Sequence, residues 1–380
     1  MTLGKPIEVA VYYFPQYHPD PRNDVWHGAG WSEWELMKAA RPRYHGHKQP
    51  KAPAWGYFDE SDPKWAAKEI DIAADSGIDA FIYDWYQFED GPFLQDGLDK
   101  GFLNAPNRDR IKFGIMWANH DWPSMFPARA VDRLACLVPG RVSREVFDRV
   151  ADEVIERYFP RPNYWTVDGE PYFSIYEIGN LIAGLGGVDE TRDAFDSFRA
   201  KTLAAGFPGL HLNVVVWGME VLPTVVQLAN PEQIVAELGV SSTTTYAWAH
   251  HYPVNSDGFP KGSYEKAAAR NYEAWEEFTS RFPVPYHPNV SMGWDPSPRT
   301  CQSDLYESRG YPWTAILDGN TPEAFKAALE KAKAFVSRPE CEQKIVTINA
   351  WNEWTEGSYL LPDTEHGTAY LDAIREVFGA

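Results

Sequence analysis

Segments typical of β-strands alternate with segments typical of α-helices about eight times along this chain. The expected strands are short runs rich in apolar, β-branched and aromatic residues, at 7–14, 78–86, 111–118, 171–176, 212–217, 240–246, 289–292 and 344–349. Between and after them, helices are expected, at 62–77, 93–103, 143–158, 189–205, 264–281, 321–336 and 370–377. This alternation predicts an α/β fold, a (β/α)8 TIM barrel, rather than an open, doubly wound sheet.

The chain of 380 residues exceeds the usual size of one domain, but a single barrel commonly reaches this length. A hydrophobic fraction of 44% is sufficient for a large core. No internal repeat, low-complexity tract or linker divides the sequence. We therefore predict one barrel domain over residues 1–380.

Polar and aromatic residues gather where the expected strands end. In a (β/α)8 barrel these ends meet on one face, which is where active sites lie. The sequence therefore predicts a single substrate-binding pocket lined by Tyr13, Asp84, Trp85, Trp117, Asn119, His120, Asp121, Glu177, Trp217, His250, Trp294, Asn349 and Trp351. For Asp84 the alternative is to hold a neighbouring Arg or Tyr. For Trp217 and Trp294, which would stack on sugars, the alternative is to fill the mouth of the barrel.

The segment between the first strand and the first long helix, 16–63, is expected to be a long loop dense in Trp, His and Glu. Loops of this length in compact domains are usually functional or disordered, and the aromatic content argues against disorder. We predict that His18, Trp31, Glu33 and Trp34 contact substrate. Packing within the loop itself is the alternative.

The last expected strand leads directly into a polar and aromatic segment that contains Glu353 and Glu356, three residues apart. A helical turn would place both carboxylates on one side. Paired carboxylates are the usual means of cleaving a glycosidic bond, and indole rings bind sugar faces. We therefore predict that these two glutamates are catalytic. A capped loop with an exposed carboxylate pair is the simpler alternative.

Five strings, spread in order over about residues 8–376, resemble the WbsX-like proteins, a branch of the glycoside hydrolase family 99-like barrels. They are Tyr12-Tyr-Phe-Pro-Gln-Tyr-His-Pro19, Gly30-Trp-Ser-Glu-Trp34, His47-Lys-Gln-Pro50, Gly77-Ile-Asp-Ala-Phe81 and Asn349-Ala-Trp-Asn-Glu-Trp-Thr-Glu-Gly357. The resemblance departs at the third strand, where Trp117-Ala-Asn119 is followed by His120 and Asp121 instead of directly by an acidic residue. The sugar bound there is expected to differ accordingly.

The resemblance implies an endo-acting, retaining enzyme related to α-mannosidases and α-mannanases, with no metal or organic cofactor. It implies that Glu353 is the base that activates the sugar's own 2-hydroxyl, so that a 1,2-anhydro sugar forms. Glu356 would then be the general acid and base. The branch also carries a glycosyltransferase label from surface-polysaccharide (O-antigen or capsule) biosynthesis, which makes glycosyl transfer the alternative function.

The net charge of −19 argues against nucleic acid and anionic membrane surfaces as partners. Three widely spaced cysteines and the adjacent pair His250-His251 match neither a disulfide framework nor a metal site. The N-terminus lacks the pattern of a signal peptide, and no apolar run is long enough to insert into a membrane. We therefore expect a cytoplasmic protein as the sequence stands, and a periplasmic or secreted one if a leader has been removed.

The best-supported prediction is a glycoside hydrolase that cleaves an α-linked glycan or bacterial polysaccharide. A sugar-nucleotide transferase would need a diphosphate site, and the one glycine-rich stretch, Ala183–Gly187, lies away from the predicted strand ends. A non-catalytic glycan-binding module would need the aromatic lining but not the paired glutamates. The oligomeric state is open from sequence.

Overall fold

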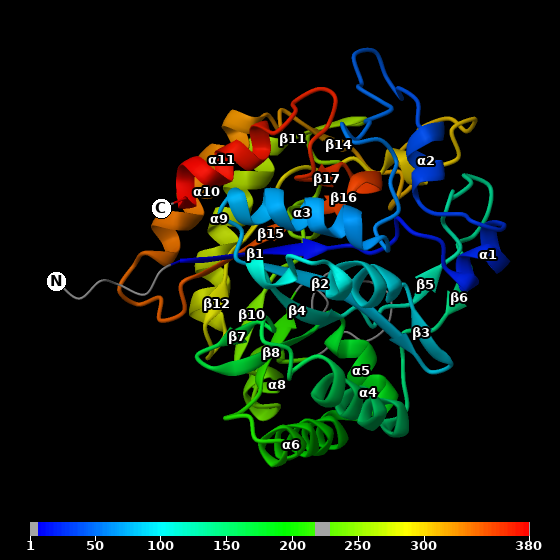
Figure 1. Cartoon of the computed structure of the whole chain (residues 1–380). Helices are drawn as coiled ribbons and strands as arrows, with labels where there is room; N and C mark the ends of the chain where they lie inside the picture. The colour runs from blue at the N-terminus through cyan, green and yellow to red at the C-terminus, as the bar shows by residue number, and fades with distance from the viewer. Residues whose placement is uncertain (1–6, 217–228, 380) are drawn as a thin grey trace.

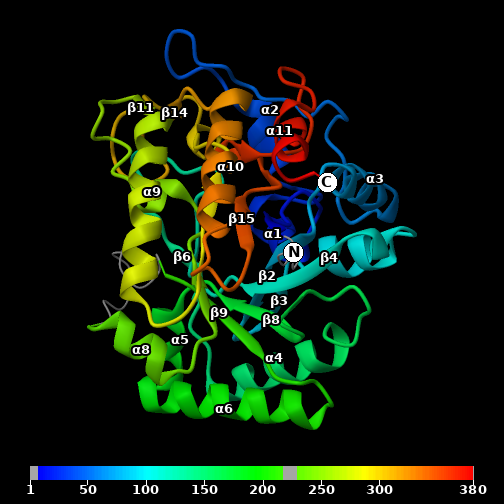
Figure 2. The same ribbon diagram turned by 90° about the vertical axis from the view of Figure 1, so that its left-hand side faces the viewer.

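Parallel strands form a nearly closed barrel at the centre of the protein, with helices around it (Figures 1 and 2). The computed structural model describes residues 7–216 and 229–379. The strand order is β12-β10-β9-β8-β4-β2-β1-β15-β13. The bounds are β1 (Glu8–Tyr13), β2 (Ala80–Phe88), β4 (Lys112–Trp117), β8 (Glu170–Ile175), β9 (His211–Val215), β10 (Ser242–Thr244), β12 (Tyr286–His287), β13 (Asn289–Ser291) and β15 (Ile345–Asn349). The predicted TIM-barrel fold is confirmed.

The seventh barrel position is occupied by two short strands, β12 and β13, which are separated by Pro288. Proline has no backbone N–H and cannot donate to a ladder, so a continuous strand is interrupted there. The first part pairs with β10 and the second with β15, while the carbonyl of Pro288 accepts a hydrogen bond from the Thr347 amide at 3.0 Å. The two ends of the sheet are thereby joined.

The helices cover the outside of the barrel. Figure 2 shows α9, α10 and α11 along one side and α4, α6 and α8 along another. Their bounds, with those of the remaining α-helices described, are α1 (Pro21–His27), α2 (Trp34–Ala39), α3 (Pro63–Asp75), α4 (Arg144–Arg157), α5 (Ile178–Leu185), α6 (Val188–Ala204), α8 (Pro231–Glu237), α9 (Tyr264–Arg281), α10 (Pro322–Val336) and α11 (Ala369–Phe378). No helix in the described part of the chain is long and apolar enough to cross a membrane.

Polar side chains cap the N-terminal ends of α3 and α4. Asp62 accepts a hydrogen bond from the Lys64 amide at 2.9 Å, with Pro63 at the first helical position of α3. Ser143 accepts from the Val146 amide at 3.4 Å at the start of α4. Each cap satisfies a backbone donor that has no partner inside its helix.

Three predicted segments differ from the structure. The helix expected at 93–103 is instead the end of β3 (Gly91–Phe93), a π-helical turn at Gly97–Gly101 and a 3-10 turn. A Cβ on Gly101 would lie 2.2 Å from the Glu60 carbonyl oxygen, so this segment packs directly on backbone. The long loop contains α1 and α2. Helix α5, which was not predicted, is short and mostly apolar and is separated from β8 by two residues.

Side chains on each strand alternate between the barrel interior and the layer beneath the helices. On β1 and β2, Tyr12 and Ile82 belong to the interior cluster, whereas Tyr13 and Tyr83 pack in the surrounding core. The hydroxyl of Tyr13 donates to Glu69 of α3 at 3.0 Å. This alternation decides which residues at the strand ends reach the mouth of the barrel.

Glu69 is a buried carboxyl of α3 that lies between Tyr13 and Trp351, with the Trp351 Nε1 also at 3.0 Å. Burial raises its pKa to about 8. The folded state therefore retains a proton that the unfolded chain releases near pH 4.5, and the stability that this proton supports is lost as pH rises toward 8.

We expect Glu69→Gln, which keeps a neutral group of the same shape, to remove this pH dependence. The wild type should lose about 1 kcal/mol of unfolding free energy between pH 7 and pH 9 from this group, and the variant should not. Urea unfolding at both pH values measures the difference, with Glu35→Gln on the exposed face of α2 as the control. Equal pH dependence in wild type and Glu69→Gln would contradict the assignment.

Candidate active site

The paired glutamates lie in a short hairpin that follows β15. The hairpin consists of β16 (Asn352–Glu353), a 3-10 turn at Trp354–Glu356 and β17 (Ser358–Tyr359). Gly357 allows the return of the chain, because it has a φ of 65° and a Cβ there would lie 2.6 Å from the Cβ of Asp295. Glu353 and Glu356 are only 4% and 5% exposed. The turn therefore presents two buried carboxyls at the C-terminal end of the barrel.

Arg299 joins both glutamates. Its Nη1 donates to the Oε1 of Glu356, and its Nη2 lies 3.6 Å from the Oε1 of Glu353. Its Nε donates to the Oε1 of Glu33 at 3.1 Å and to the Thr355 hydroxyl at 2.9 Å. The guanidinium is itself 5% exposed. One buried cation therefore holds three carboxyls from distant parts of the chain.

Glu33 supports the turn between the two glutamates. Its Oε2 accepts a hydrogen bond from the Thr355 hydroxyl at 2.8 Å, and the Tyr17 hydroxyl lies 3.4 Å away. The side chain is fully buried. The structure thus brings Glu33 to the predicted site, where it acts through Arg299 and Thr355.

A second hydrogen-bonded group reaches Glu353 from the barrel interior. The Tyr246 hydroxyl lies 3.1 Å from the Oε2 of Glu353 and 2.8 Å from the Oδ2 of Asp84. The Asn349 amide donates to the same Oε2 of Glu353 at 3.2 Å. Of the two alternatives for Asp84, the structure therefore shows the contact with a neighbouring tyrosine.

Tyr311 approaches Glu356 from the rim. Its hydroxyl donates to the Oε1 of Glu356, although the residue as a whole is 39% exposed. Its ring lies 5.8 Å from that of Trp294, whose Nε1 donates to the Thr314 hydroxyl at 3.0 Å. Trp294 also lies 5.9 Å from the ring of His250. These side chains form an aromatic wall beside Glu356.

Tyr311→Phe is expected to lower kcat of the proposed reaction by roughly 10-fold or more, because a hydrogen bond to a charged group contributes about 1.5–3 kcal/mol. The folded structure should remain, since the ring is unchanged. Steady-state kinetics measures kcat, and circular dichroism checks that the fold is unchanged. Tyr57→Phe is the matched control, as Tyr57 has the same exposure and lies against Trp34. An unchanged kcat for Tyr311→Phe would contradict a role for its hydroxyl.

Burial controls the protonation of the site. It raises the pKa of Glu353 well above its ordinary value, and the neighbouring Glu356 raises it further, whereas Arg299 opposes the shift. Burial likewise raises the pKa of Asp84. It lowers the pKa of His250 to about 4, so this imidazole is neutral at pH 7. The site therefore combines several carboxyls with one guanidinium.

The residues after β4 form one side of the site. His120 lies 5.3 Å from the ring of Tyr176 and 5.8 Å from that of Tyr86, two tyrosines whose pKa values are raised by burial and by the carboxyls Asp84 and Glu353. Its Nδ1 is 2.8 Å from the carbonyl oxygen of Asp121. His120 is thus brought toward the glutamates.

Three other predicted site residues near this strand end brace the backbone. The Asn119 side chain donates to the Glu177 carbonyl and accepts from the Glu177 amide, both at 2.8 Å. The Glu177 carboxyl accepts from the Gly179 amide at the start of α5, and Asp121 accepts from the Gly140 amide. These contacts fix the ends of β4 and β8.

Four of the predicted aromatic residues point toward the surrounding helices and lie outside the site: Tyr13, Trp85, Trp117 and Trp351. The strand alternation explains the first three, and Trp351 donates to Glu69 of α3. Their placement corrects the prediction that every residue at a strand end lines the pocket. Trp217 lies outside the described residues.

The predicted residues of the long loop, other than Glu33, pack within that region. His18 contacts the Glu60 carboxyl at 2.8 Å. Trp34 donates to the Phe58 carbonyl at 2.6 Å and lies 5.7 Å from Trp354, so it supports the turn from behind. Trp31 lies 4.2 Å from His27. Loop-internal packing, the alternative for these residues, is what the structure shows.

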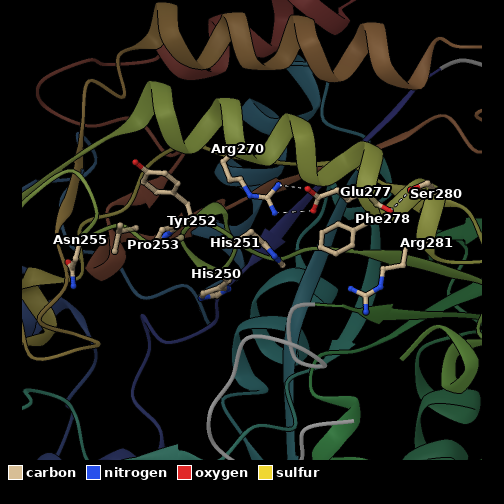
Figure 3. Close-up of a pocket in the computed structure, with 12 residues that line it drawn as sticks. His250, His251, Tyr252, Pro253, Asn255, Arg270, Glu277, Phe278, Ser280 and Arg281 are labelled. Carbon is tan, nitrogen blue, oxygen red and sulfur yellow. Dashed lines mark hydrogen bonds and ion pairs between the residues drawn. The ribbon is translucent and has the colours of Figure 1, made fainter. Parts of the chain in front are cut away.

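A cavity of about 850 Å³ lies along α9 (Figure 3). It is lined by residues 249–255 and by one side of α9, where Arg270 donates two hydrogen bonds of 3.0 Å to Glu277. His250 belongs to this lining, and its ring is 6.2 Å from that of Tyr246. Neither Glu353 nor Glu356 belongs to the lining, and His250 connects it with the aromatic wall through Trp294. Within residues 7–216 and 229–379, no cluster of His, Cys, Asp and Glu is arranged to hold a metal ion.

Two residues that matter most to the geometry, Arg299 and Tyr311, were missed from sequence. Arg299 follows β13 by eight residues and Tyr311 lies still further along, so neither stands at a strand end. The signal that could have pointed to them is the segment after the seventh expected strand, which begins with the polar and aromatic residues Trp294 and Asp295.

Comparisons with known proteins agree with this architecture. Residues 9–374 match the family described as glycosyltransferase WbsX. The chain is 26% identical over 381 residues to a protein of Xanthomonas campestris pv. campestris described as uncharacterized protein WxcX. That alignment covers 98% of this chain and 49% of the relative, so the chain spans about half the length of the curated relatives that it matches.

Two solved structures share the fold at low identity. A glycoside hydrolase-like protein has a TM-score of 0.64 at 16% identity, covering 100% of this chain and 96% of the other. The family GH99 endo-α-mannosidase of Bacteroides thetaiotaomicron, in complex with bis-tris-propane, has a TM-score of 0.58 at 12% identity, covering 97% and 95%. At these identities the similarity establishes the barrel fold.

Proposed function

We propose that this chain, which belongs to the WbsX family, is a glycoside hydrolase that cleaves within an α-linked glycan or bacterial polysaccharide. The observation that carries the proposal is the pair of buried carboxyls, Glu353 and Glu356, at the C-terminal end of a TIM barrel, both held by Arg299. The barrel fold shared with glycoside hydrolases supports the same reaction class.

Glu353 is proposed as the base. It takes the proton of the sugar 2-hydroxyl, whose oxygen attacks C1 while the bond from C1 to the leaving oxygen breaks. Glu356 gives its proton to that leaving oxygen, and a 1,2-anhydro sugar results. Glu356 then takes a proton from water, the water oxygen attacks C1 while the bond from C1 to O2 breaks, and Glu353 returns its proton to O2. Two displacements at C1 retain the anomeric configuration.

The contact of Glu356 with Arg299 belongs to a cluster that contains more carboxyls than cations. Three carboxyls, those of Glu33, Glu353 and Glu356, share this one guanidinium. One positive charge cannot offset three buried negative charges, so mutual repulsion keeps a proton within the cluster. The hydrogen bonds to Glu356 reach its Oε1, which leaves Oε2 for the leaving oxygen.

Glycosyl transfer from a sugar nucleotide is the second candidate, because the matching family is named a glycosyltransferase. A diphosphate would need exposed backbone amides or a basic cluster. The glycine-rich stretch at the C-terminal end of α5 packs against the neighbouring loop instead, since a Cβ on Gly184 would lie 2.5 Å from the Val142 carbonyl oxygen. Tight binding of a nucleotide sugar in calorimetry would favour this candidate.

The proposed hydrolase can be tested by incubating the protein with a panel of α-mannans and bacterial surface polysaccharides. Mass spectrometry should detect oligosaccharides with the wild type and none with Glu356→Gln. Proton NMR of the fresh products should show the anomeric configuration of the substrate. Products formed equally by both proteins, or an inverted anomer, would contradict the proposed mechanism.

A further inference from the structure

The Tyr246 hydroxyl lies between two carboxyls, 2.8 Å from the Oδ2 of Asp84 and 3.1 Å from the Oε2 of Glu353. A phenol carries one hydrogen, so it can donate fully to only one of these oxygens. Both distances are those of hydrogen bonds. The second contact is therefore a hydrogen bond only if the carboxyl on that side carries a proton and donates it to the Tyr246 oxygen.

The two carboxyls have different surroundings, which indicate where this proton lies. Glu353 accepts from the Asn349 amide at 3.2 Å and lies 3.6 Å from the Arg299 guanidinium, and both neighbours favour a negative charge. Asp84 is 3% exposed, and among the described residues its one hydrogen-bond partner is Tyr246. Its Oδ1 meets no donor within residues 7–216 and 229–379, so a charge on Asp84 would be poorly compensated.

We propose that Asp84 is the protonated end of a hydrogen-bonded chain, Asp84 to Tyr246 to Glu353, and that this arrangement keeps Glu353 ionised and able to act as a base. Asp84 donates its proton to the Tyr246 oxygen, and Tyr246 donates its own to Glu353. The assignment of Glu353 as the base rests on the proposed function. Asp84 is a positioning residue, since it acts on Glu353 through Tyr246.

The other ionisable groups around this chain are Tyr12, Tyr86, Tyr176, Glu33, Glu356 and Arg299. Burial raises the pKa of each of the three tyrosines, so they remain neutral at pH 7. Burial, Glu356 and Glu33 raise the pKa of Glu353, whereas Arg299 lowers it; a charge on Asp84 would raise it further. Burial raises the pKa of Asp84, in the direction that retains its proton. Arg299 contacts the Glu353 end of the chain.

Infrared difference spectroscopy of the resting protein locates the proton without any substrate. At neutral pH, the spectrum of the wild type minus that of Asp84→Asn should contain the carbonyl band of a protonated carboxyl. Contributions of Glu69 and Glu177, whose pKa values are raised to about 8, are common to both proteins and cancel. If Asp84→Asn instead loses the bands of an ionised carboxylate, Asp84 is charged in the wild type and the proposal is overturned. In Tyr246→Phe the band should remain but shift, because the acceptor of the Asp84 proton is removed.

The pH dependence of kcat/KM gives a second readout. Asparagine is neutral, like the protonated Asp84, and can still donate to Tyr246, so Asp84→Asn should leave the acidic limb at the same pH. If Asp84 were ionised, removing its charge would move that limb to lower pH by about one unit. If the wild type cleaves glycans but the infrared band is absent, the proton assignment to Asp84 is overturned and the proposed function is not. The band without turnover on any glycan supports the proton assignment and contradicts the proposed function.

Discussion

Replacing Glu356 with glutamine is expected to lower kcat for glycan cleavage by at least about 1,000-fold, which is within the range of general acid–base catalysis. Glutamine cannot give a proton to the leaving oxygen. Glu353→Gln should cause a loss of the same order, because the amide cannot take the proton of the 2-hydroxyl. Initial rates on the best substrate of the panel measure both.

Glu69→Gln is the matched control for these variants, since Glu69 is an equally buried glutamate that contacts Tyr13 and Trp351 outside the site. It should retain the wild-type rate at pH 7. Activity retained in either Glu353→Gln or Glu356→Gln would exclude the paired-glutamate mechanism.

Replacing Arg299 with methionine is expected to destabilise the fold by about 3–5 kcal/mol, the usual cost of removing one partner from a buried ion pair. The change leaves Glu33, Glu353 and Glu356 without their shared cation. Glu33 and Glu353, whose pKa values Arg299 lowers, should then take up protons, and catalysis should be lost together with stability. Urea unfolding at pH 7 measures the change in free energy.

Arg270→Met is the control, because Arg270 also makes two hydrogen bonds to a glutamate but on the partly exposed side of α9. Exposed pairs contribute roughly 0–1 kcal/mol. If both variants lost the same small amount of stability, Arg299 would not have the structural role described above. Arg299→Lys should be intermediate, since a lysine keeps the charge but cannot contact three carboxyls with a fixed planar group.

The barrel and the position of the paired glutamates could be predicted from sequence because both depend on local patterns. Alternating strand and helix segments predict the fold, and the position of Glu353 and Glu356 just after the last strand predicts their place on its C-terminal face. Neither prediction needs knowledge of which distant residues meet.

The lining of the site was harder to predict, because a strand end alone does not show which way a side chain points. Asn349 reaches Glu353, whereas Trp351 lies against α3. Tyr13 and Trp117, also at strand ends, likewise point toward helices. The sequence therefore predicts too many aromatic residues in the pocket, since both the pocket and the helix layer of a barrel contain them.

Arg299 and Tyr311 could not be identified because they come from the long segment after β13, whose path depends on tertiary packing. Arg299 is placed by its contacts with Glu33 and Thr355, residues 266 and 56 positions away. Such contacts leave no local pattern. The role of Tyr246 likewise depends on tertiary packing, because its hydroxyl lies between Asp84 and Glu353.

The most direct test of the central claim is cleavage in water enriched in the heavy oxygen isotope, followed by mass spectrometry of the products. A glycoside hydrolase should incorporate one heavy oxygen at each new reducing end with the wild type, and Glu356→Gln should release no product. Products that form only with a nucleotide sugar and carry no heavy oxygen would contradict hydrolysis and identify a transferase.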